Sequence, residues 1–231
     1  MPEWLERAAP GHLAVFLGKE ASPRKSGLFV RHLCRCFPEV FPDPRSLAAL
    51  DAADRHEAGE IGDREFSAAL TAAGAAVDSA QEGLDPLSAE YWSAGARLAR
   101  SAVLAAHIAR EVASHGFSSN VLSQLRRVVL DHAGGGGGPR KNPIARGMRP
   151  VFLEHFGDTH RPVARDPSWL TDTVLALARQ MYESRDFGAM PILADALQDA
   201  GCDSADILGH CRGPGPHVRG CWVVDLVLSK E

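Results

Sequence analysis

Four residues near the C-terminus have the side chains and the spacing of a zinc site. Cys202, Cys211, His217 and Cys221 follow the pattern C-x8-C-x5-H-x3-C. Thiolates and imidazoles are ligands that zinc prefers, and three short intervals allow four such groups to surround one tetrahedral ion. Four protein ligands close the coordination sphere, so the predicted role of such an ion is structural rather than catalytic.

The same four residues have a simpler interpretation as parts of a hydrophobic core. Cysteine is often buried as a small hydrophobic residue, and His217 can satisfy a backbone group. The order of ligands is similar to that of CCCH zinc fingers with the last two types exchanged, but only Trp222 is placed for the base stacking that such fingers use. We favour the core interpretation, so no cofactor is expected unless this constellation binds zinc.

A second group of residues could bind an anionic partner. Residues 126–165 carry eight Lys or Arg against three acids, whereas residues 43–90 carry eleven acids against three Arg. Within the basic span, Arg140, Lys141, Arg146 and Arg149 are candidates for phosphate contacts of a nucleic acid. The formal net charge of −4 and the pI of about 6.2 lack the basic balance usual in such proteins, so solvated helix faces of opposite sign are the favoured explanation.

The elements that would position these residues are predicted to be helices, which makes the fold all-α. Asp43-Pro44 and Asp166-Pro167 are N-terminal helix signals, and Gly59, Gly116 and Gly201 are stop signals. The apolar run 221–228 fits either a helix or a strand, and we favour a helix because no second strand candidate is available to pair with it. Helices are predicted at 44–58, 63–73, 89–115, 121–130, 167–181, 187–200, 204–210 and 221–228.

A run of five glycines divides the chain into two parts. Gly134 to Gly138, followed by Pro139, disfavour any regular element. The predicted organisation is an N-terminal helical domain at 1–133, a glycine-rich basic linker at 134–147 and a smaller compact helical domain at 148–231.

Composition and cysteine usage indicate a cytoplasmic globular protein. Hydrophobic residues make up 45% and charged residues 23% of the chain, which are ordinary globular proportions. The first ten residues lack the apolar segment of a secretory signal, and no apolar run reaches the roughly 20 residues of a membrane span. Five cysteines cannot all pair, and a reduced compartment disfavours disulfides. No membrane partner is expected.

Several motifs resemble an uncharacterised protein family of planctomycete-type bacteria. They begin with residues 21–29 and Cys34-Arg-Cys36, continue through Arg161-Pro162-Val163 and 191–202, and end with the closing segment His210-Cys-Arg-Gly-Pro-Gly-Pro-His-Val-Arg-Gly-Cys-Trp-Val-Val-Asp225. The resemblance covers the whole chain and is closest after Arg161. Gly27 and the glycine run depart from the family pattern. The resemblance implies a bacterial, cytoplasmic, helical protein and supplies no activity, cofactor or catalytic residue.

The leading functional prediction is a non-enzymatic one. The sequence contains no local signature of a catalytic site, so we expect a protein-interaction or adaptor module, or an accessory subunit of a larger complex, with a protein as its partner. The alternative is a zinc-stabilised domain that binds nucleic acid through residues 126–165. A hydrolase with an active site assembled from distant residues is a third class that the sequence leaves open.

Overall fold

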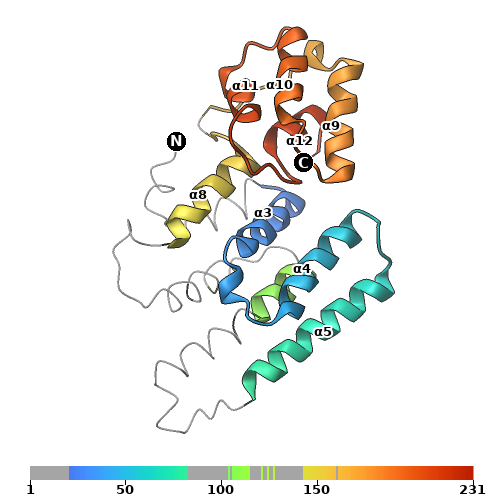
Figure 1. Cartoon of the computed structure of the whole chain (residues 1–231), viewed down its shortest axis with the longest axis vertical. Helices are drawn as coiled ribbons and strands as arrows, with labels where there is room; N and C mark the ends of the chain where they lie inside the picture. Colours follow the sequence, from blue (N-terminus) through green and yellow to red (C-terminus); the bar gives the residue numbers. More distant parts are fainter. Residues whose placement is uncertain are drawn as a thin grey trace. The chain divides into compact units, whose positions relative to one another are not determined.

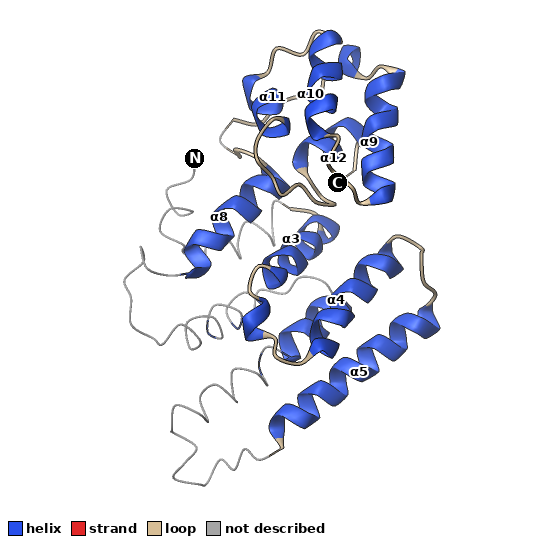
Figure 2. Cartoon of the chain, viewed as in Figure 1, coloured by secondary structure: helices blue, strands red, loops and turns tan. Residues whose placement is uncertain are grey.

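A computed structural model describes residues 21–82, 104, 106–114, 121, 124, 127, 143–159 and 161–230. Within these residues the regular elements are helices and no strand occurs, which confirms the all-α prediction (Figures 1 and 2). In the same residues, no helix has the length and apolar character needed to cross a membrane. The chain divides into two compact units, and the boundary falls inside one helix, between Val151 and Phe152.

The first described helices form a short series at the start of the N-terminal unit. They are α3 (Pro23–Arg35), the 3-10 turn η1 (Pro38–Val40), α4 (Pro44–Glu57) and α5 (Asp63–Gln81). Helix α4 begins at the predicted signal, because the Asp43 side chain accepts a hydrogen bond from the backbone N–H of Arg45. Asp63 is the first residue of α5 and not its cap, which is Gly62. Helices α4 and α5 lie side by side across a short turn (Figure 1).

Ion pairs connect α3 to α4. Arg31 of α3 is only 5% exposed, and its guanidinium pairs with Asp54 at 2.6 Å and with Glu57. One turn later, Arg35 pairs with Asp51 at 2.8 Å and with Asp54 at 2.6 Å. The two arginines therefore share Asp54, and the contact between the helices has a partly buried ionic component.

Several predicted elements fall partly or wholly outside the described residues. The predicted helix at 89–115 is described at residues 104 and 106–114, which are helical and bury Ile108 and Val112. Residues 134–142 of the predicted linker at 134–147 lie outside the described residues. Its last residues begin α8 (Pro143–Phe156), a helix that the sequence pattern did not predict because Gly147 and Pro150 lie inside it.

The C-terminal unit runs from Phe152 to the end of the chain and contains four further helices. They are α9 (Asp172–Ser184), α10 (Met190–Asp199), α11 (Ala205–Cys211) and α12 (Trp222–Leu228), preceded by the 3-10 turn η4 (Pro167–Trp169). Helix α9 contacts α10 and α12, and α11 contacts α10 and α12. The ambiguous run at 221–228 is therefore a helix, as favoured.

The start predicted for α9 was wrong by about one turn. Asp166 does accept a hydrogen bond from the backbone N–H of Ser168, but Asp166-Pro167 opens only the short turn η4. Thr171 is the true N-cap, since its side chain accepts from the backbone N–H of Val174. Two capping residues five positions apart compete for the helix start, and the second one begins the longer helix.

A single hydrophobic cluster holds this unit together. It includes side chains that are at most 1% exposed from each of the four helices, among them Met181, Leu193, Ile207 and Val224. The thiols of Cys202, Cys211 and Cys221 belong to the same cluster. Burying an apolar side chain of this size contributes about 1.5–3 kcal/mol, so the cluster stabilises the packing of the four helices.

Candidate metal centre

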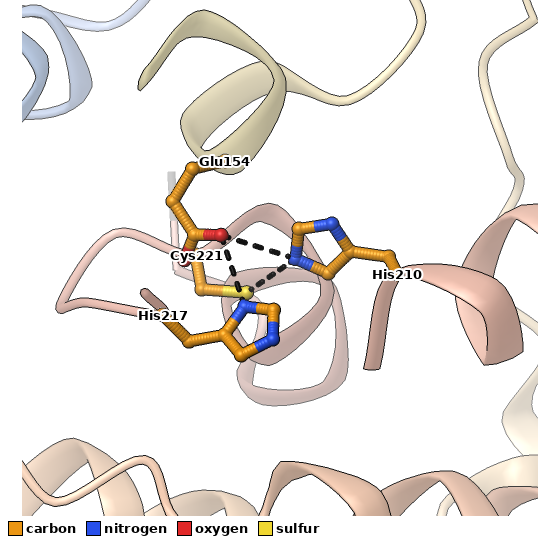
Figure 3. Close-up of side chains that lie close together, drawn as sticks. All are labelled: Glu154, His210, His217 and Cys221. Atoms are coloured by element: carbon orange, nitrogen blue, oxygen red, sulfur yellow. Dashed lines mark hydrogen bonds and ion pairs between the residues drawn. The ribbon is translucent and has the colours of Figure 1, made fainter. Parts of the chain in front are cut away.

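Four metal-competent side chains converge at one end of the C-terminal unit. They are Glu154, His210, His217 and Cys221, and one ligand atom from each lies within 4.8 Å of the others. Figure 3 shows the carboxylate, both imidazoles and the thiol directed toward a common point. The set offers one oxygen, two nitrogens and one sulfur to an ion.

Helix α8 and the segment that runs from α11 to the start of α12 supply these groups. Glu154 lies in the last turn of α8 and His210 near the end of α11. Cys221 is the residue before α12, and His217 lies in the irregular loop that joins α11 to α12. The loop is short and contains Gly213-Pro-Gly-Pro216, which prevents a continuous helix from α11 to α12 and turns the chain back toward α8.

Three of the distances between these groups are close to those of a zinc coordination shell. His217 Nδ1 lies 3.0 Å and His210 Nε2 lies 3.4 Å from Glu154 Oε2, and His210 Nε2 lies 3.2 Å from Cys221 Sγ. Zinc–ligand bonds of 2.0–2.3 Å in a tetrahedron place neighbouring ligand atoms roughly 3.3–3.6 Å apart. Small side-chain adjustments would therefore allow all four groups to bind one ion.

The centre is buried, and burial governs its protonation in the absence of an ion. The side chains of Glu154, His217 and His210 are 7%, 9% and 16% exposed. Burial and the nearby His217 lower the pKa of His210 to about 4, and burial and the Glu154 carboxylate raise the pKa of the Cys221 thiol well above its usual value. A bound cation would favour the Cys221 thiolate and the unprotonated His210 imidazole, the forms that bind metals.

Glu154 also fixes the loop between α11 and α12. One carboxylate oxygen accepts a hydrogen bond from His217 Nδ1, and the other accepts from the backbone N–H of Val218 at 3.0 Å. Among the described residues, the charge partners of this buried carboxylate are imidazoles and not Lys or Arg. Burying a carboxylate without a permanent positive charge is costly, and a divalent cation would remove that cost.

A close contact holds the end of α8 beside the centre. Gly157 follows the helix in the left-handed region, with φ of 63°, and its N–H bonds the carbonyl of Leu153 at 3.0 Å. A Cβ placed on Gly157 would lie 3.1 Å from Trp222 Cδ2. Only glycine fits both the backbone conformation and the space left by the indole. Gly157, three residues after Glu154, therefore determines how α8 ends.

Gly157 is not a ligand, but its substitution should still disturb the metal centre. Gly157→Ala is expected to destabilise the C-terminal unit by about 1–3 kcal/mol, because of the positive φ and the contact with Trp222. Thermal unfolding of the full chain measures this. Gly201 is the matched control, since it also has a positive φ, of 90°, but a Cβ there meets no atom within 4 Å. Equal losses for Gly157→Ala and Gly201→Ala would show that the Trp222 contact adds nothing.

The structure brings together two of the four residues that the sequence pattern combined. His217 and Cys221 belong to the convergent set, whereas Cys202 and Cys211 pack in the hydrophobic core, 2% and 0% exposed. Neighbouring residues of a helix point about 100° apart, so His210 and Cys211 face different directions, and His210 takes the place beside Cys221. Burial raises the pKa of the Cys211 thiol to about 12, as expected for a core cysteine.

Sequence reasoning missed Glu154 and His210. The spacing H-x6-H-x3-C from His210 to Cys221 is a local signal that includes three of the convergent residues. Glu154 is 63 positions from His217 and has no such signal.

The residues proposed for nucleic-acid contact are only partly described. Arg140 and Lys141 lie outside the described residues. Arg146 is in α8, and Arg149, also in α8, is exposed.

Comparisons of the chain with protein-family models, with curated proteins and with solved structures find no match. The structure itself defines an all-α protein whose described residues include a group of side chains able to bind a metal ion.

Proposed function

We propose that the C-terminal unit is a metal-stabilised helical module and that the chain acts as a binding protein rather than as an enzyme. The observation that carries this proposal is the convergence of Glu154, His210, His217 and Cys221 within 4.8 Å of one another in a buried position. Four protein ligands would surround the ion completely. A metal ion with no position left for substrate or water contributes folding energy and not turnover.

The ligand set favours zinc over the other common divalent ions. Two imidazoles and a thiolate are borderline to soft ligands, which suit zinc, whereas magnesium and calcium take oxygen ligands in larger numbers. Glu154 supplies the only oxygen of the set. With Glu154 and Cys221 as anions, a divalent ion would leave the buried centre electrically neutral, which supports its stability in a low-dielectric interior.

We further propose that the partner is a protein. Exposed acids on α4 and α5 support this choice, since the side chains of Asp51, Asp63 and Glu65 are 67%, 101% and 58% exposed. These three acids pair with Arg35, His56 and Arg55, but residues 43–90 as a whole carry eleven acids against three Arg. That excess would attract a basic protein surface and repel nucleic acid. Three predictions from the sequence accompany this proposal: a role as an adaptor, a cytoplasmic location and membership of the planctomycete-type family.

Elemental analysis of the untagged full chain tests the metal-stabilised module. After purification without added metal we expect one zinc per chain, and removal of that zinc by a chelator should lower the thermal transition of the C-terminal unit. Readdition of zinc should restore the transition, whereas magnesium should not. If the protein neither retains nor takes up zinc, the four side chains form only a hydrogen-bonded cluster and the proposal is wrong.

A further inference from the structure

The four groups of the metal centre are unevenly distributed along the chain. His210, His217 and Cys221 lie within one stretch formed by α11, the loop and the start of α12. Glu154 alone comes from α8. The three local residues can hold an ion without α8, so the additional bond from Glu154 would act as a cross-link between the last turn of α8 and residues 210–221.

The last turn of α8 is buried and makes polar contacts through Glu154. Phe152 and His155, which flank Glu154, are both 0% exposed. The polar contacts of Glu154 go to His210, His217 and Val218, all of them in the same stretch of the chain. Detachment of the turn from residues 210–221 would therefore break these contacts together.

The charge of Glu154 makes the attachment dependent on the ion. With a divalent cation in the centre, the carboxylate is a metal ligand with a strong electrostatic partner. Without the cation, the same carboxylate stays buried beside imidazoles, with no Lys or Arg partner among the described residues. The buried position then costs desolvation energy that solvent exposure of the turn would recover.

We propose that metal occupancy of this centre locks the last turn of α8 onto residues 210–221, so that the ion regulates the exposure of the turn. The inference rests on the proposed metal-stabilised module and adds regulation at the same centre. Helices α9 and α10 contribute no ligand and pack through the hydrophobic cluster. They remain folded when the ion is removed, whereas the turn around Glu154 opens.

Hydrogen exchange on the full chain tests this lock. Zinc-loaded and chelated protein are compared at a temperature below the thermal transition of the chelated form. After chelation we expect exchange at residues 153–157 to be at least about tenfold faster, relative to α9, than in the zinc-loaded protein, because the turn opens locally whereas α9 amides exchange only when the unit unfolds. In Glu154→Gln, zinc should no longer alter exchange at 153–157. Glu183→Gln is the matched control, because Glu183 is exposed on α9, and it should respond as the wild type does.

The outcomes separate this inference from the proposed function. Wild-type protein that takes up no zinc contradicts the metal-stabilised module itself. Protein that binds zinc but shows unchanged exchange at 153–157 contradicts only the lock. Residues 153–157 that keep the same protection relative to α9 after chelation also overturn the lock, since the turn would then open only when the whole unit unfolds. A zinc response that persists in Glu154→Gln would show that the Glu154 bond is not the cross-link.

Discussion

Cys221→Ser is expected to remove the metal from the C-terminal unit and to lower its thermal transition by more than about 15 °C. Zinc present at about 1,000 times its dissociation constant stabilises a folded state by about 4 kcal/mol. For a unit of this size, each kcal/mol corresponds to about 4–8 °C. A serine hydroxyl is a poor zinc ligand, so the variant should lose this stabilisation. The measurements are elemental analysis and thermal unfolding with and without chelator.

Cys211→Ser is the matched control for this prediction. Both thiols are 0% exposed and both belong to the hydrophobic cluster, but only Cys221 belongs to the convergent set. Cys211→Ser should cost about 1–3 kcal/mol because it buries a hydroxyl, and it should keep one zinc per chain and the sensitivity to chelator. Loss of zinc from Cys211→Ser as well as from Cys221→Ser would instead favour the C-x8-C-x5-H-x3-C ligand set, in which both thiols are ligands.

The contrast between these thiols shows what sequence spacing can predict about the centre. The C-terminal end of the chain could be identified because cysteine and histidine are concentrated there, and His217 and Cys221 do lie together. Spacing alone does not say which of two neighbouring residues on a helix faces the centre. That choice depends on packing: Cys211 faces the core formed by α9, α10 and α12, so His210 faces α8.

Glu154 could not be predicted for a different reason. It lies in a helix that propensity disfavours, since α8 contains Gly147 and Pro150. Its pairing with His217 spans 63 positions and depends on how α8 packs against the rest of the C-terminal unit. Local patterns carry no information about such a long-range contact. Local patterns do predict α4 and α11 from their N-cap residues, and α12 from its apolar run.

Arg31→Ala is expected to destabilise the N-terminal unit by about 3 kcal/mol. Removing one partner of a buried ion pair typically costs about 3–5 kcal/mol, because the other charge is left buried. Here Asp54 keeps Arg35 and Glu57 keeps Arg24, so the lower end of that range applies. Hydrogen exchange of the α3 and α4 amides under native conditions gives the free energy of opening of this part of the chain.

Two further variants separate the charge of Arg31 from its packing. Arg35→Ala removes an arginine that also pairs with Asp54 but is 32% exposed, against 6% for Arg31, so it should cost no more than about 1 kcal/mol. Arg31→Met restores most of the buried volume without the charge. It should recover only part of the loss, because the carboxylates of Asp54 and Glu57 still lack their shared partner. Full recovery with methionine would show that Arg31 acts through the packing of its hydrocarbon chain, and the ionic contact between α3 and α4 would then contribute little to stability.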